Sequence, residues 1–129
     1  TVRRVERGHP LGPGQRFVDY WMQPGGWAGM PPQRRAAIAG AMSTVKAEWD
    51  AVFREPTPLS AFADLDVPVL YLTGSESPAS GREGARLLAK VLPRVTVIEV
   101  EGVGHMAPVT HPDRINALIE RHLDGAPLH

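Results

Sequence analysis

The chain is 129 residues long and 43% hydrophobic, which matches the size and composition of one ordinary compact domain. Its 14 basic and 14 acidic residues cancel, so there is no electrostatic basis for binding nucleic acid or an anionic membrane. The sequence has no cysteine, which excludes disulfides, thiolate metal ligands and cysteine nucleophiles and favours a cytoplasmic location, and no apolar run approaches the roughly 18 residues of a membrane span.

The chain begins at Thr1 rather than at methionine. This start indicates that the chain begins partway through a longer gene product. An N-terminal threonine can act as a nucleophile through its own amine. The sequence around Thr1 has no strand-like pattern, so an internal start explains this residue more simply.

Residues 1–66 are predicted to form a helical segment. An amphipathic stretch at residues 14–22 ends at the sequence PGG of residues 24–26. After it, a proline pair at residues 31–32 suits a helix start, and apolar residues then recur at spacings of four and three. These apolar positions are Ile38, Met42, Val45, Trp49 and Val52. The spacing predicts one apolar stripe on a helix of roughly 20 residues, which the prolines at 56 and 58 end.

Residues 67–129 follow a different, alternating pattern. The apolar run at residues 67–72 predicts a strand buried on both faces of a parallel sheet, and residues 95–100 predict a second strand. Residues 81–92 carry apolar side chains at helical spacing, and Pro112 suits the first turn of a final helix. The order strand, helix, strand, helix predicts a parallel crossover in an α/β sheet. Two strands alone do not make such a sheet stable.

Three stretches of this second part carry a more specific pattern. The sequence VPVLYLTG at residues 67–74 is followed by GVGHMAP at residues 102–108 and by HPD at residues 111–113. Together they resemble the end of the α/β-hydrolase fold, in which the penultimate strand ends in a glycine and an acid-bearing loop, and the last strand leads into a Gly-His pair. The aromatic sequence FVDYW at residues 17–21 lies where these enzymes insert their cap.

The resemblance implies an α/β fold of a particular kind. The chain would be the C-terminal part of an α/β-hydrolase, with a helical cap segment over residues 1–66. Residues 67–129 would form a strand-helix-strand-helix unit of the parallel sheet, as one incomplete domain.

By this resemblance His105 is the triad histidine and the general base. An imidazole that takes a proton from a hydroxyl and later gives it to a leaving group needs a fixed position. A loop at the carboxyl end of a parallel strand supplies such a position. The flanking glycines, Gly102 and Gly104, allow the backbone to turn sharply there. The alternative is a loop histidine that is satisfied by a backbone carbonyl.

The other two members of a triad are not evident. The family's nucleophile motif, G-x-S-x-G, does not occur in the sequence. Ser43 lies within a predicted helix, and Ser75 and Ser77 follow a strand without the second glycine, so structural roles are expected for all three. The family's acid follows the penultimate strand as Gly-x-x-Asp, and Ser77 stands at that position. Glu76 is the candidate acid; the alternatives are a solvated Glu76 and an acid after an earlier strand.

Aromatic residues of the first segment are candidates for substrate binding. Tyr20, Trp21 and Trp27 would line a pocket between cap and sheet, or would simply be core. Trp49 is assigned to the core because it lies on the apolar stripe of its helix. No histidine has a partner at metal-ligand spacing, so no metal site is expected. The resemblance implies no cofactor, because side chains carry the family's chemistry.

Two functions follow from these observations. In the first, the chain supplies the triad histidine for hydrolysis of an ester or related bond in a small apolar substrate, and the isolated chain is inactive. In the second, it is a non-catalytic α/β module that forms oligomers. An open strand edge invites pairing with another chain, so we expect either self-association or pairing with a missing N-terminal half.

Overall fold

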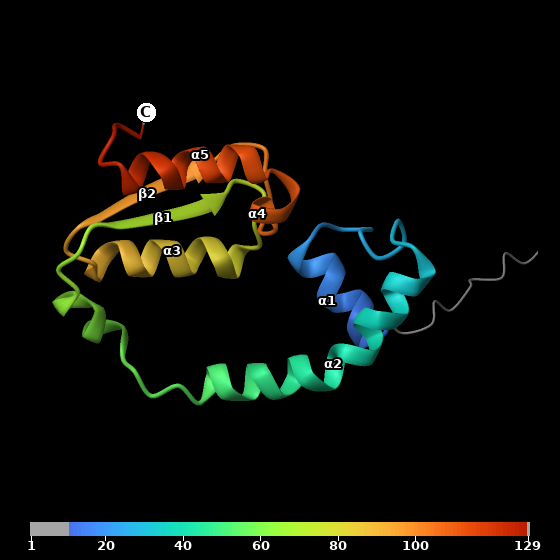
Figure 1. The fold of residues 1–129 in the computed structure, drawn as a ribbon. Coiled ribbons are helices and arrows are strands. Elements are labelled where there is room, and N and C mark those ends of the chain that lie inside the picture. Colours follow the sequence, from blue (N-terminus) through green and yellow to red (C-terminus); the bar gives the residue numbers. More distant parts are fainter. Residues whose placement is uncertain (1–10, 129) are drawn as a thin grey trace, which may run out of the picture.

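The structure of the protein is a computed structural model that describes residues 11–128. The chain forms two helices and then alternates between strand and helix (Figure 1). In chain order the elements are α1 (Pro13–Trp21), α2 (Pro32–Phe53), the 3-10 helix η1 (Leu59–Asp64), β1 (Val69–Gly74), α3 (Ala79–Val91), β2 (Val95–Val100), α4 (Ala107–Thr110) and α5 (Pro112–Leu123). The helices and strands expected from the sequence are confirmed for α1, α2, β1, α3, β2 and α5. The short helices η1 and α4 have no periodic signal in the sequence.

The two strands form a parallel pair, with Val69 opposite Val95 at one end and Gly74 opposite Val100 at the other. α3 connects the strands and lies on one face of the sheet, whereas α5 lies on the other face (Figure 1). The predicted parallel crossover is therefore confirmed. The carboxyl ends of both strands point toward α4 and α1, at the edge where α/β sheets place their functional groups.

One cluster of buried hydrophobic residues lies between the sheet and α5, and other buried residues, such as Val18 of α1 and Ala85 of α3, lie outside it. Its members come from β2, the loop after it, α4 and α5: Val100, Val103, Ala107 and Ile115. The prediction of strands buried on both faces is wrong for this chain, because β1 is only partly buried and β2 leaves three of its six residues exposed. Each face is covered by a single helix, and within residues 11–128 the sheet has no third strand. Neighbouring strands and helices would be needed to bury the remaining surface.

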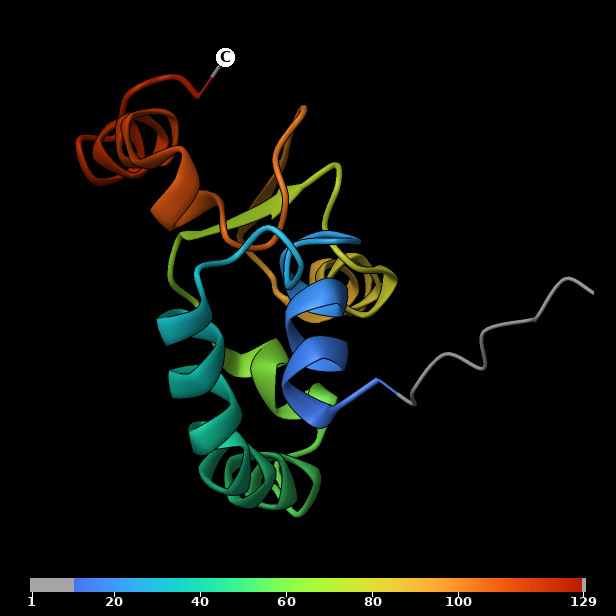
Figure 2. The same cartoon turned by 90° about the vertical axis from the view of Figure 1, so that its right-hand side faces the viewer.

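α2 begins at its proline pair and runs to Phe53, yet none of its residues is buried. The helix packs against α1 and extends away from the sheet (Figure 2). Its apolar stripe is therefore largely open: Phe53 is 81% exposed and Val52 is 61% exposed. Trp49 is only partly buried, which corrects its assignment to the core.

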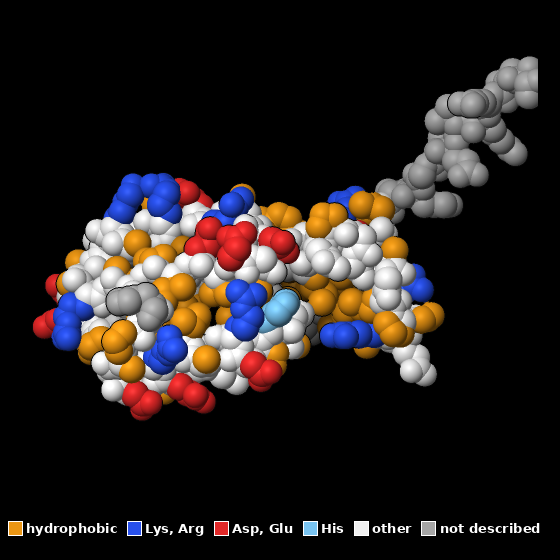
Figure 3. Space-filling model, turned by 90° about the horizontal axis from the view of Figure 1, so that it is seen from above, with side chains coloured by type: hydrophobic (Ala, Val, Ile, Leu, Met, Phe, Trp, Pro, Cys, Tyr) orange, Lys and Arg blue, Asp and Glu red, His pale blue; other side chains and the backbone are white. Residues whose placement is uncertain are grey.

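Hydrophobic side chains are also exposed on the face seen from the side of α5, where a histidine lies among them (Figure 3). On α5, Leu123 is 76% exposed. No helix in residues 11–128 combines the length and the apolar composition that crossing a bilayer requires.

Candidate active site

His105 lies in the loop between β2 and α4, at the carboxyl end of the parallel strands. Hydrogen bonds hold this loop against the loop that follows β1. The amide of Glu76 donates to the carbonyl of Val103 at 3.0 Å, and the amide of Gly102 donates to Oγ of Ser75 at 2.8 Å. The backbone that carries His105 is therefore attached to the ends of both strands.

Two glycines allow these loops to come together. A Cβ atom at Gly74 would lie 2.2 Å from the carbonyl oxygen of Val103, so only glycine fits at the end of β1. Gly102 has a φ of +71°, which L side chains rarely adopt, and it turns the chain out of β2. Gly74, the last residue of β1, thus allows the loop of His105 to pack against the end of the strand.

The imidazole of His105 lies between α1 and α3. Its ring centroid is 4.7 Å from that of Trp21, with the two planes inclined at 48°. Its Nδ1 atom is 3.8 Å from the position that a Cβ would take at Gly81, in the first turn of α3. The side chain is exposed, and no hydrogen bond to it is formed by the residues between 11 and 128. Within this part of the chain, neither imidazole nitrogen is engaged by another residue.

A series of aromatic rings leads from His105 to α2. The rings of Trp21 and Trp49 are stacked, with centroids 5.8 Å apart and planes at 22°. Phe53 stacks on Trp49 in turn at 5.6 Å. Tyr20 contacts Trp21 edge-on at 5.0 Å, and its hydroxyl donates a hydrogen bond of 2.8 Å to Oγ of Ser80 on α3. α1 is thereby tied to α3 on one side of His105 and stacked on α2 on the other.

An apolar cavity of about 550 Å³ lies between α1, α2 and His105, and we call it the His105 cavity. Its walls come from both helices and from the loop of His105: Phe17, Val18, Trp21, Met22, Arg34, Ile38, Val45, Glu48, Trp49, Val52, His105 and Met106. Trp21 is the one predicted pocket aromatic that lines it. Trp49 and Arg34 also line it, although the sequence analysis gave neither a functional role. Helical spacing identifies a stripe but does not reveal whether the stripe faces a core or a cavity.

A second, more polar cavity of about 900 Å³ adjoins the first and shares Met22, Arg34 and Met106 with it. Tyr20 and Glu76, both predicted as site residues, line this second cavity and not the His105 cavity. Glu76 is exposed and forms no side-chain hydrogen bond with His105 in the structure. The structure thus places the candidate acid in the loop next to His105 without bringing the two side chains together.

The remaining predicted residues are placed elsewhere. Trp27 packs its ring against Gly14, and its backbone amide donates to Oδ1 of Asp19 at 2.9 Å, so it lines neither cavity. Oγ of Ser77 accepts a 3.2 Å hydrogen bond from the amide of Gly74 and is buried, which is a structural role. Thr1 lies outside the described residues. Within them, no three histidine or carboxylate side chains gather as metal ligands.

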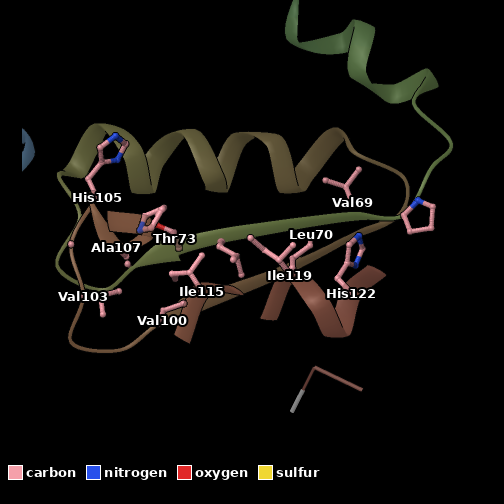
Figure 4. Close-up of a pocket in the computed structure, with 15 residues that line it drawn as sticks. Val69, Leu70, Thr73, Val100, Val103, His105, Ala107, Ile115, Ile119 and His122 are labelled. Atoms are coloured by element: carbon pink, nitrogen blue, oxygen red, sulfur yellow. The ribbon is translucent and has the colours of Figure 1, made fainter. Parts of the chain in front are cut away.

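A third hollow, the sheet groove, runs along β1 between the strand and α5 and has a volume of about 520 Å³ (Figure 4). His105 lies at one end of this groove and His122 at the other, with Leu70 and Ile119 between them. The groove is lined mainly by apolar side chains of the strands and of α5. His105 therefore faces two apolar hollows, one toward the helices α1 and α2 and one along the sheet.

Known proteins share this architecture. The chain is similar in structure to a meta-cleavage product hydrolase, with a TM-score of 0.59 and 16% identity over 87% of this chain and 45% of that protein. It is also 30% identical over 66 residues to (E)-2-((N-methylformamido)methylene)succinate hydrolase of Acinetobacter baylyi. These 66 residues are 51% of this chain and correspond to 25% of that enzyme. The chain thus spans less than half the length of either protein.

The structural likeness shows the fold, which is that of an α/β-hydrolase, and the predicted fold class is confirmed. The family model described as alpha/beta hydrolase family matches residues 2–118, nearly the whole chain. The chain belongs to the α/β-hydrolase family.

Proposed function

We propose that this chain supplies the general base of a hydrolase, His105, for cleavage of an ester or related bond in a small apolar substrate. The observation that carries the proposal is the position of His105. Its imidazole lies at the carboxyl end of a parallel strand, forms no hydrogen bond with residues 11–128, and opens on an apolar cavity of about 550 Å³. Apolar cavities with a few polar groups are the usual form of small-molecule sites.

The chemistry assigned to His105 is proton transfer. The imidazole accepts a proton from an attacking hydroxyl and later donates it to the leaving group. Trp21 covers one side of the ring and so limits its rotation. The substrate's apolar group would lie on the stacked rings of Trp21 and Trp49, between α1 and α2, which together would act as the cap.

The other catalytic groups are proposed to come from outside these 129 residues. The sequence has no G-x-S-x-G motif, and its two loop serines bond backbone amides. The sheet groove along the open edge of β1 is a suitable surface for the missing part, because a further strand and its helix would cover both the edge and the apolar lining. Glu76 remains the candidate acid within the chain if its side chain rotates toward His105, and a carboxylate of the missing part is the alternative.

A second candidate function is a non-catalytic module that associates with copies of itself. It is favoured by the open strand edges and by exposed apolar residues such as Phe53 and Val52. The absence of cysteine favours a cytoplasmic location for either function.

Turnover of p-nitrophenyl butyrate separates the two functions. The 129-residue chain alone is expected to hydrolyse it no faster than free imidazole does, because loss of one triad member already costs several orders of magnitude. A protein that also contains the nucleophile should show turnover that saturates with substrate. Saturable turnover by the 129-residue chain would contradict the proposal that the nucleophile lies outside it. No turnover in the longer protein would favour the non-catalytic module.

A further inference from the structure

The His105 cavity is apolar except at three lining residues, namely His105 itself, Arg34 and Glu48. Arg34 is in the first turn of α2 and lines both the His105 cavity and the adjoining second cavity, so its side chain lies where the two meet. It is the one lysine or arginine in either lining.

No carboxylate of residues 11–128 forms an ion pair with Arg34. The three ion pairs of this part of the chain involve other residues, and none includes Arg34. Glu48 lies 14 positions further along α2, which is roughly 21 Å at 1.5 Å per helical residue. Asp19 and Glu76 line the second cavity together with Arg34, but neither forms an ion pair with it. Arg34 therefore lies at the end of the apolar cavity that contains His105, and within residues 11–128 it has no ion-pair partner.

We propose that this site takes an amphipathic monocarboxylate, and that Arg34 determines this specificity. The proposal rests on the proposed function of the same cavity. The apolar group of the ligand lies between α1 and α2 on Trp21 and Trp49, and its carboxylate meets the guanidinium of Arg34. Arg34 is exposed, so its guanidinium is accessible to a ligand, and a planar guanidinium offers two parallel N–H donors to a carboxylate.

The adjacent Arg35 provides a matched control. It has the same charge and lies on the same turn of α2, but it lines neither the His105 cavity nor the second cavity. If a preference for carboxylate ligands came only from positive charge at this end of α2, Arg34→Gln and Arg35→Gln would reduce it equally. If it came from a specific contact with Arg34, only Arg34→Gln would remove it.

The test is a binding titration of the chain with 4-phenylbutyrate and with its neutral analogue 4-phenylbutanamide, followed by tryptophan fluorescence. Trp21 and Trp49 line the cavity, so both ligands should change the emission. We expect the carboxylate to bind on the order of 10-fold more tightly than the amide at low salt. Arg34→Gln should abolish this preference without weakening the amide, Arg34→Lys should retain part of it, and Arg35→Gln should leave it intact.

Each other outcome overturns a definite statement. If Arg34→Gln keeps the preference, or if Arg35→Gln removes it equally, the assignment of Arg34 is wrong. If the unmodified chain binds both ligands equally, the monocarboxylate class is wrong while the cavity stands as a ligand site. If neither ligand changes the emission or binds by calorimetry, the cavity is not a substrate site, and the proposed function fails with it.

Discussion

The indole of Trp21 lies against the imidazole of His105, with ring centroids 4.7 Å apart. This contact joins the N-terminal helical part of the chain to the loop at the end of the sheet. Because Trp21 also stacks on Trp49, a movement of α2 would be transmitted to the ring that borders the histidine. The position of His105 thus depends on the docking of α1 as well as on its own loop.

The hydrogen bond between Tyr20 and Ser80 should contribute to this docking. Tyr20→Phe and Ser80→Ala each remove one partner of an exposed 2.8 Å bond. Each substitution should lower the free energy of unfolding by about 0.5 kcal/mol, the low end for a hydrogen bond, because water replaces the lost partner. In a double-mutant cycle measured by urea denaturation, the second substitution should then cost almost nothing further. Fully additive effects would show that the two hydroxyls are not coupled.

Gly74 and Gly40 make a matched pair for testing the packing of the loop that carries His105. Gly74→Ala would place a methyl group 2.2 Å from the carbonyl oxygen of Val103. It should lower the free energy of unfolding by about 3 kcal/mol and displace the loop of His105. Gly40→Ala meets no atom within 4 Å inside α2 and should raise the free energy of unfolding by about 0.5–1 kcal/mol. Thermal unfolding would measure both, and equal effects would contradict the close approach of the two loops.

The sequence determines the α/β part of this fold more fully than the site. Val95–Val100 forms a strand with the predicted bounds, because a short apolar run between Pro93 and a glycine-rich loop has few other structures available. His105 could be singled out as a candidate because its flanking glycines and its place after a strand are local features. The place of Arg34 and Trp49 in the cavity lining could not be identified in this way, because it depends on which side of α2 faces His105, and this is set by the packing of α1 against α2.

The burial of the strands was overestimated for a related reason. An apolar run such as that of β1 suits a strand with neighbours on every side, whereas within residues 11–128 the sheet has two strands and one covering helix on each face. Ser77, which follows Glu76, makes a contact that the sequence pattern does not reveal. The resemblance would place an aspartate at Ser77, whose hydroxyl accepts a hydrogen bond from the amide of Gly74 and closes the turn after β1.

Gly81→Asp would test the geometry around His105 by adding an acid. The new Cβ would lie 3.8 Å from Nδ1 of His105, so the carboxylate could accept the Nδ1 proton, and an acidic side chain suits the first turn of α3. A downfield imidazole N–H resonance should appear in the proton NMR spectrum. Gly81→Ala fills the same space without an acceptor and should not produce it. If neither variant shows the resonance in a folded chain, His105 does not face α3.

The open edge of β1 should make the 129-residue chain self-associate. Sedimentation equilibrium at micromolar concentration should give a mass above that of the monomer, because the sheet groove exposes apolar surface beside an unpaired strand edge. Ile119→Lys places a charge in the groove and should weaken the association. Leu123→Lys, four residues further along α5 and outside the groove, should not. A sharp monomer mass with a cooperative thermal transition would show that the chain closes its own core.

The most direct measurement is the effect of His105→Ala on ester turnover by a protein that contains this chain together with its nucleophile. If His105 is the general base, kcat should fall on the order of 10³-fold or more while the protein remains folded. His111→Ala, which alters another exposed histidine six residues away, should leave kcat within about twofold of the unmodified protein, since it removes no group from the proton transfer. A kcat that is unchanged in His105→Ala, or that falls equally in both variants, would contradict the assignment of His105 as the catalytic base.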